Sequence, residues 1–236
     1  MLLNIYKPKG FTSFDIVAKV RRQLNIKKVG HAGTLDPLAE GVLVVLTGDD
    51  TKKQDDIMKQ AKTYEAEITF GAYSPTLDLE CTPKLIRKVT LTELKENLPK
   101  FFTKYLGEIK QLVPDYSAKK IHGKPMYELA RKPGGLTDQV PIYKDVIISD
   151  IKVLAFGEHE VLVEPENTSV IQTDSPTKII LPYVVIKVEC SHGTYLRALA
   201  RDFGNDLTCG AVLTKLVRTR VGNYSIENAL PLANVK

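Results

Sequence analysis

The segment from residue 30 to residue 45 constrains the fold most, because a glycine-punctuated turn carrying one carboxylate runs straight into an apolar stretch. It reads Gly-His-Ala-Gly-Thr-Leu-Asp-Pro-Leu-Ala-Glu-Gly-Val-Leu-Val-Val. Proline fixes its own φ at about −65° and pushes the preceding residue out of helical geometry, so Pro37 should hold Asp36 in place. The branched apolar run from Val42 to Leu46 suits a buried strand. The segment therefore predicts a fixed acid in a loop ahead of a strand, where it can act as a nucleophile.

A second interpretation of the same residues is structural. Asp-Pro also begins helices, with the aspartate as N-cap and the proline at the first helical position. On spacing alone this is the more common use of the pair. The loop taken alone leaves both interpretations open.

The hydrophobic patterning of the remaining chain mixes strands and helices without strict alternation. This predicts an α+β fold with a mixed, largely antiparallel sheet flanked by helices. The expected strands are residues 2–6, 42–46, 62–72, 142–155 (or a hairpin arm), 182–190 and 212–221. The expected helices follow Thr12 or Ser13, cover residues 54–61, 91–98 and 126–131, run from Gly193 to a stop at Gly204, and follow Ser225.

Some of these elements carry detailed expectations. Thr12 and Asp15 have the spacing of a capping box at the start of the first helix. The apolar stripe expected on that helix consists of Phe14, Val17, Val20 and Leu24. In residues 62–72, apolar side chains alternate with Glu65, Glu67 and Thr69, which predicts one wet face. The polar stretch 164–178 contains two prolines and is predicted to be a loop insertion.

Length and composition describe an ordinary globular protein. The 236 residues, 43% of them hydrophobic and 26% charged, suffice for one core or for two subdomains around a shared cleft. No apolar stretch is long enough to span a bilayer, and the N-terminus lacks the features of a secretory signal, so we expect a cytoplasmic protein. The three cysteines are odd in number and far apart, which favours neither a disulfide framework nor a zinc site. We see no coiled-coil stripe and expect a monomer.

The net charge of +5 is a modest indication of a polyanionic partner, and the distribution of the charges is more informative. Each basic cluster alone is most simply a solvated face. Three such clusters, each beside a segment that could form a site, together favour contact with phosphates. They comprise Lys19, Arg21, Arg22, Lys27 and Lys28; Lys119, Lys120 and Lys124; and Lys215, Arg218 and Arg220.

The block from Gly30 to Gly41 resembles the signature of the TruB family of tRNA pseudouridine synthases. Further segments resemble the same family in the same order, and together they extend from about residue 3 to about residue 230. They are residues 7–13, 62–64, 76–78, 116–123 with 127–131, 190–197 and 216–222.

The resemblance implies a pseudouridine synthase fold with one catalytic domain over residues 1–236 and a central active-site cleft. It implies that Asp36 is the catalytic residue, that Arg197 pairs with it and that Tyr64 stacks on the target base. It also implies a set of substrate contacts: His31, which helps to displace the target nucleotide, Asp78, Leu216, which closes the apolar side of the pocket, Lys7, Lys9, Lys119 and Lys120.

Without the resemblance, several of these residues have plainer interpretations. Tyr64 would be a half-buried core tyrosine. Arg197 and Arg201 would be solvated charges on one helix face, and His31 would satisfy a loop carbonyl. The other histidines, His122, His159 and His192, show no metal-ligand spacing and are structural or RNA-contacting.

The implied reaction breaks the N-glycosidic bond of a uridine, turns the uracil and rejoins it through C5. It involves no redox change and requires neither a cofactor nor a metal. Asp36 can attack the anomeric carbon, attack C6 of the base, or assist bond cleavage and removal of a sugar proton, and the sequence does not choose among these routes. Burial disfavours an ionised carboxylate and a close guanidinium favours it, which gives Arg197 its expected part.

The family's usual substrate, the uridine at position 55 in the T loop of tRNA, is carried over as an implication. Many members have a C-terminal RNA-binding module of the PUA type, which we expect to be absent here, and we expect no obligate protein partner. One alternative is a non-catalytic RNA-binding or tRNA-folding protein on the same scaffold, and another is a guide-RNA-dependent relative. A small hydrolase using Asp36 and His31 lacks any supporting motif.

Overall fold

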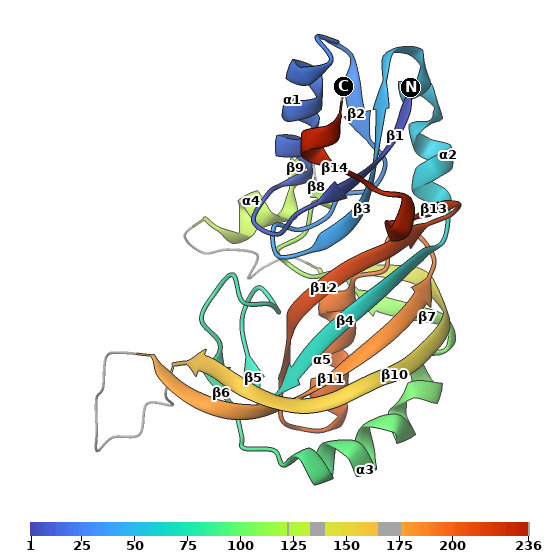
Figure 1. Cartoon of the computed structure of the whole chain (residues 1–236). Helices are drawn as coiled ribbons and strands as arrows, with labels where there is room; N and C mark the ends of the chain where they lie inside the picture. The colour runs from blue at the N-terminus through green and yellow to red at the C-terminus, as the bar shows by residue number, and fades with distance from the viewer. Residues whose placement is uncertain (122, 133–139, 165–175, 236) are drawn as a thin grey trace.

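One mixed sheet forms the frame of the molecule (Figure 1). The computed structural model describes residues 1–121, 123–132, 140–164 and 176–235. Within them the sheet has ten strands in the order β14-β1-β3-β12-β4-β11-β10-β7, with β13 beside β12 and β2 beside β3. The strands are β1 (Leu2–Lys7), β2 (Val29–His31), β3 (Glu40–Thr47), β4 (Lys62–Phe70), β7 (Gly107–Leu112), β10 (Tyr143–Val163), β11 (Thr177–Cys190), β12 (Ala211–Val221), β13 (Tyr224–Ser225) and β14 (Leu230–Pro231).

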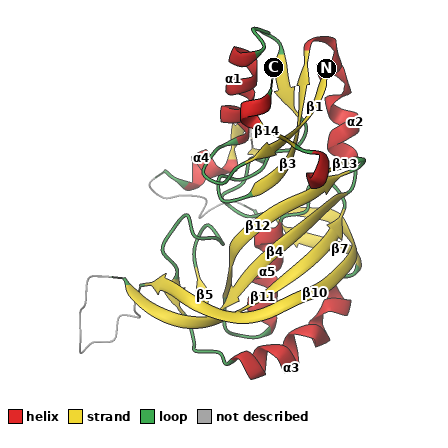
Figure 2. Cartoon of the chain, in the orientation of Figure 1, coloured by secondary structure: helices red, strands yellow, loops and turns green. Residues whose placement is uncertain are grey.

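The helices lie around this sheet, as Figure 2 shows. They are α1 (Ser13–Gln23), α2 (Gln54–Lys59), α3 (Leu91–Phe101), α4 (Met126–Ala130) and α5 (Leu196–Asp206). Short 3-10 turns are η1 (Gly48–Lys53), η2 (Phe102–Tyr105), η3 (Ile226–Asn228) and η4 (Leu232–Asn234). Two small ribbons pair β5 (Ala72–Tyr73) with β6 (Lys84–Leu85) and β8 (Lys120–Ile121) with β9 (Lys124–Pro125). None of the helices in the described residues has the length and apolar character needed to cross a membrane.

The predicted α+β class and the largely antiparallel sheet are confirmed. Among the pairs of the large sheet, β1 with β14 and β3 with β12 are parallel, whereas the other pairs recorded there run antiparallel. The strands expected at 2–6, 42–46, 182–190 and 212–221 and the helices expected at 54–61, 91–98 and 126–131 are present with small changes at their ends. The segment 142–155 is one arm of the long β10–β11 hairpin.

The largest core cluster lies between the sheet and the helices α3 and α5. It joins Ile68 and Phe70 of β4 to Leu94 of α3 and to Leu199 and Phe203 of α5. Burial of these side chains on one face of β4 and β11 fixes α5 against the sheet, and the first turn of α5 is where the functional site begins.

Helix α1 begins as expected but buries a different stripe. Thr12 accepts from the backbone N–H of Asp15, and the Asp15 carboxylate accepts from that of Thr12, so the capping box is present. Phe14 is wrong as a core residue, because its side chain is 72% exposed. Ile16 takes its place, since Ser13 is turned inward toward the loop of Asp36 and this sets the rotation of the helix.

The wet face expected for residues 62–72 is also wrong. Glu65 is exposed, but Glu67 and Thr69 on the same face are buried. The reason is topological, because β4 is a central strand between β11 and β12 and His159 of the β10–β11 hairpin lies against Thr69. Residues on this face therefore form a buried polar cluster.

Three smaller expectations change as well. Helix α5 continues past Gly204 to Asp206, because a Cβ at Gly204 would lie 2.4 Å from the backbone nitrogen of Ala211 and glycine permits this close approach to β12. Ser225 precedes the 3-10 turn η3 and not an α-helix. Of the loop expected at 164–178, Thr177 already belongs to β11, and residues 165–175 lie outside the described residues.

Replacement of Gly204 by alanine tests this close approach. In an open helix the change would stabilise by about 1 kcal/mol, whereas here we expect the free energy of unfolding to fall by about 1–3 kcal/mol through overpacking against β12. Urea denaturation measures it. Asn205→Ala, at the next and exposed position, serves as the control and should change stability by less than about 0.5 kcal/mol. Equal stability of the two variants would contradict the packing described.

Candidate active site

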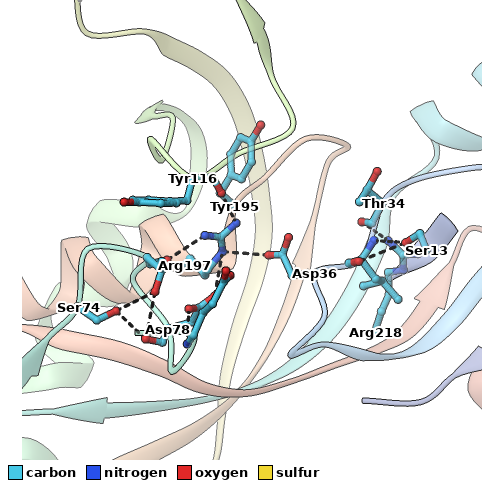
Figure 3. A network of polar contacts seen from close by, with 12 residues as sticks. Ser13, Thr34, Asp36, Ser74, Asp78, Tyr116, Tyr195, Arg197 and Arg218 are labelled. Carbon is cyan, nitrogen blue, oxygen red and sulfur yellow. Dashed lines mark hydrogen bonds and ion pairs between the residues drawn. The ribbon is translucent and has the colours of Figure 1, made fainter. Parts of the chain in front are cut away.

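Asp36 lies in the turn between β2 and β3, at the centre of a polar network (Figure 3). No helix follows it, and the backbone N–H of Ala39 donates to the carbonyl of Asp36 at 3.0 Å in a tight turn. The interpretation of Asp-Pro as a helix start is therefore wrong for this chain. The Asp36 side chain is 39% exposed, so the carboxylate can reach a molecule from outside.

Hydrogen bonds on both sides of Asp36 fix the turn. The Ser13 hydroxyl accepts from the N–H of Leu35 at 2.9 Å and donates to its carbonyl at 3.2 Å. The N–H of Gly10 donates to the carbonyl of Pro37 at 2.8 Å. The turn is therefore tied to the start of α1 and to the loop after β1, and the carboxylate is held by backbone contacts as well as by the proline.

Arg218 of β12 shapes the same turn from below. Its guanidinium is 1% exposed and donates from Nε to the carbonyl of Val42 at 2.8 Å, from Nη2 to that of Gly33 at 3.0 Å and from Nη1 to that of Thr34 at 3.4 Å. Gly41 has a φ of +103°, and a Cβ there would lie 2.3 Å from the Arg218 carbonyl, so glycine is required where β3 meets β12.

The sequence indicated Arg218 only as a member of a basic cluster and not as a site residue. The available signal was its place in the segment 216–222, which resembles the closing strand of the family. Its burial could not be read from the sequence, because lysine and arginine are almost always exposed unless their charge is partnered.

Arg197 in the first turn of α5 binds Asp36 directly. Nε donates to Oδ2 of Asp36, Nη1 to the carbonyl of Thr76 and Nη2 to the carbonyl of Tyr116, each at 2.9 Å. The guanidinium is buried, so its interpretation as a solvated charge is wrong. Figure 3 shows the second carboxylate oxygen of Asp36 pointing away from Arg197. One oxygen is thus held and the other remains available.

Asp78 shares the guanidinium of Arg197. Its Oδ2 lies 3.7 Å from Nε of Arg197, and its Oδ1 accepts from the N–H of Glu80 at 2.9 Å. Burial raises the pKa of Asp78, and these hydrogen bonds and Arg197 oppose that effect. The structure therefore places Asp78 beneath Arg197, where it supports the pair with Asp36.

Tyr64 and Leu216 form an apolar wall of the same site. Tyr64 on β4 lies opposite Arg218 in the register with β12. Burial raises the pKa of Tyr64, so its hydroxyl keeps its proton at neutral pH, while the charge of Arg218 acts in the other direction. Leu216 belongs to the same buried cluster as Tyr64 and as Leu35, the residue before Asp36. A flat ring and a branched side chain thus border the acid.

His31 precedes the turn and stands beside Phe14. The two rings meet edge to face at 5.4 Å, and Phe14 is largely exposed. Burial and the charge of Arg218 lower the pKa of His31, so the ring is neutral at pH 7. Its Nδ1 has no hydrogen-bond partner in the described part of the chain, and the interpretation that it satisfies a loop carbonyl is wrong.

The four lysines expected to bind substrate differ in position. Lys7 is buried and donates to the carbonyls of Phe11 at 2.6 Å and Pro8 at 3.1 Å. Burial lowers the pKa of Lys7 to about 8, against the opposing charges of Asp36 and Glu40. A direct contact from Lys7 to RNA does not fit, because its ammonium group is enclosed by the loop that it ties down. The exposed lysines are Lys9, Lys119 and Lys120.

No group of three or more histidine, cysteine or acidic residues in the described ranges is arranged to hold a metal ion. His122 lies outside those ranges. His159 packs on Tyr183 with ring centroids 4.8 Å apart and contacts the buried polar cluster of β4.

Solved structures share this fold over 99% of the chain. A protein in a Cbf5-Nop10-Gar1 complex matches with a TM-score of 0.66 at 24% identity. One in an H/ACA RNP bound to a substrate RNA containing 2'-deoxyuridine matches with a TM-score of 0.63 at 23% identity. The present chain spans about half the length of those chains, 52% and 51%. The fold is the pseudouridine synthase fold.

The sequence comparison is more specific. The model of the TruB family pseudouridylate synthase (N terminal domain) matches residues 21–196. The tRNA pseudouridine synthase B of Clostridium tetani is 39% identical over 99% of this chain and 72% of its own length. The protein of the same name from Synechocystis sp. is 40% identical over 98% of this chain and 69% of its own length. The chain belongs to the TruB family of pseudouridylate synthases and is an enzyme of the isomerase class.

Ser13→Ala tests the tie between α1 and the turn of Asp36. The variant leaves the buried N–H of Leu35 without its acceptor, and we expect the free energy of unfolding to fall by about 1–3 kcal/mol. The control is Ser149→Ala, which removes an exposed hydroxyl bonded to the carbonyl of Glu189 and should cost less than about 0.5 kcal/mol. Denaturant titration compares the two. Similar losses in both variants would show that the Ser13 bonds do not hold the turn.

Proposed function

We propose that the protein converts the uridine at position 55 in the T loop of tRNA to pseudouridine. The observation that carries the proposal is the Asp36 carboxylate, held through one oxygen by Arg197 at 2.9 Å and still 39% exposed. The name tRNA pseudouridine synthase B of the relatives supports tRNA as the substrate. We further propose that the enzyme acts in the cytoplasm as a monomer, on the T-arm stem-loop and without an obligate protein partner or cofactor.

The reaction is an isomerisation, and its atoms balance within the substrate. The bond from the sugar C1′ to N1 breaks, a bond from C1′ to C5 forms, the proton on C5 leaves and N1 gains a proton. A carboxylate beside the sugar can attack C1′ or C6, or take a proton from the sugar. In each case Asp36 must be ionised, and its pairing with the buried Arg197 favours the charged form.

Tyr64 and Leu216 suit the second requirement, which is to hold the detached uracil while it turns. The ring of Tyr64 offers a flat apolar face on which a base can stack. Its hydroxyl is protonated at neutral pH because burial raises its pKa, and it can donate a hydrogen bond to the turning base. Leu216 closes the apolar side and keeps water from competing for the sugar.

The target nucleotide must leave the RNA loop to reach Asp36, at an unstacking cost of a few kcal/mol. The neutral ring of His31 and the exposed ring of Phe14 form an aromatic pair beside the turn, suited to stack on the bases that remain. Lys9, Lys119 and Lys120 are exposed and can contact phosphates, so we expect RNA binding to weaken as salt increases.

A non-catalytic RNA-binding or tRNA-folding protein on the same scaffold is the remaining alternative. It predicts that Asp36 or Tyr64 is lost, yet both residues are present and Asp36 is held in an ion pair. The geometry therefore favours catalysis. Separate measurement of RNA binding and product formation distinguishes the two.

Asp36→Asn removes the charge of the carboxylate and leaves its volume nearly unchanged. We expect pseudouridine formation on a T-arm transcript to fall at least about a thousandfold, because the carboxylate itself takes part in the reaction. Binding of the same RNA should stay within a few-fold of wild type. Asp55→Asn, an exposed aspartate of α2, is the control and should react normally. Product is measured by tritium release from C5-labelled uridine, and near-normal turnover by Asp36→Asn would overturn the assignment.

Arg197→Lys keeps the positive charge but loses the planar fork that reaches Asp36 and two carbonyls at once. We expect kcat to fall on the order of a hundredfold, because the carboxylate is no longer held in position. Arg201→Lys, one turn further along α5, is the matched control and should keep most of its activity. If both variants react at similar rates, Arg197 is not required to position Asp36.

A further inference from the structure

A second cavity, of about 490 Å³, lies on the face of the sheet opposite α5. Its lining includes Glu67 of β4, whose side chain alternates with Ala66 and Ile68, two residues of the core cluster that contains α5 residues. His159 and Val161 of the β10–β11 hairpin line one side, and Leu79 and Pro83 line the other. We call this cavity the hairpin cleft.

The floor of the hairpin cleft is a network of bonded polar groups. Glu67 accepts from the hydroxyl of Thr214 and from Nζ of Lys215, each at 2.8 Å. Nδ1 of His159 lies 3.6 Å from Glu67, and Nε2 of His159 hydrogen-bonds with the hydroxyl of Thr69 at 2.9 Å. The acid is thus neutralised by Lys215, and the floor presents hydroxyl, imidazole and ammonium groups in fixed positions.

The two walls of the hairpin cleft are fastened to each other. The N–H of Glu164, at the end of the hairpin arm, donates to the carbonyl of Pro83 at 2.8 Å, and the N–H of Leu85 donates to the carbonyl of Glu164 at 3.3 Å. Figure 1 shows β5 and β6 lying along this arm. Val161 and Leu79 supply apolar surface on facing walls, so the cleft has a defined shape with apolar sides and a polar floor.

The hairpin cleft adjoins the site of Asp36 on two sides. Leu79 directly follows Asp78, which contacts Arg197. Lys9 at the rim directly precedes Gly10, whose N–H holds the carbonyl of Pro37. An RNA strand with one nucleotide at Asp36 therefore has a second compartment next to it.

We propose that the hairpin cleft binds an unpaired nucleotide of the substrate RNA adjacent to the target uridine, with its base between Leu79 and Val161 and its phosphate near Lys9. The volume lies within the range of small-ligand sites, about 300–1,000 Å³. Apolar walls suit the faces of a base, the hydroxyl and imidazole groups suit its edges or the ribose, and the exposed ammonium of Lys9 suits a phosphate. This inference rests on the proposed function and adds a specificity subsite to it.

The test is a double-mutant cycle between the protein and the RNA. Thr82→Glu places a negative charge at an exposed position that lines the cleft, and Lys9→Ala removes the rim charge. Thr103→Glu, an exposed threonine of η2 away from the cleft, is the matched control. Each protein is assayed on T-arm stem-loops that carry an abasic site at one loop position other than the target, and kcat/KM and Kd are measured in parallel.

With wild type and Thr103→Glu we expect one abasic position to lower kcat/KM or raise Kd by about tenfold. Thr82→Glu should lose about as much on intact RNA and lose nothing further at that abasic position, and Lys9→Ala should show the same pattern in part. Independent, multiplicative losses at every position, or normal behaviour of Thr82→Glu on intact RNA, would overturn the proposal. If wild type forms no pseudouridine, the proposed function fails, while the Kd cycle still decides whether the cleft holds a nucleotide.

Discussion

The site depends on one buried guanidinium that joins chain segments far apart in sequence. Arg197 binds a carboxylate 161 residues away and carbonyls 121 and 81 residues away, which belong to the turn after β2 and to the loops after β5 and β7. A buried charge is costly unless its partners are in place, so each segment must arrive for the others to be stable. The same contacts that lower this cost fix the reactive acid, and the assembly of the fold and the assembly of the site are therefore one event.

A second buried guanidinium has a different task. Arg218 binds backbone carbonyls on both sides of Asp36 and so sets the course of the turn, whereas Arg197 sets the direction of the side chain. The two cations also act on their neighbours without contact with substrate, since the charge of Arg218 helps keep His31 neutral and limits the rise in the pKa of Tyr64. The available oxygen of Asp36 thus faces an environment in which the nearby rings are uncharged and the nearby charges are paired or buried.

Sequence patterns predicted the elements well where local physics dominates and less well where packing does. The capping box of α1 and the branched run of β3 follow from contacts within a few residues, and both are present. The exposed Phe14 and the buried Glu67 could not be predicted in this way. Phe14 is turned outward because Ser13 is needed at the turn of Asp36, and Glu67 is buried because a hairpin about 90 residues later covers it and supplies His159.

The sequence by itself determined the stiff Leu-Asp-Pro turn, the α+β pattern and the ordered blocks that identify the family, because dihedral restriction and side-chain periodicity are local properties. Tertiary structure alone decided which cations face solvent. Lys7 and Arg218 read as ordinary surface charges, yet both are buried against backbone carbonyls, while Lys9 remains exposed. The reason is that the burial of a charge depends on acceptors brought from distant segments, and no pattern within one segment records them.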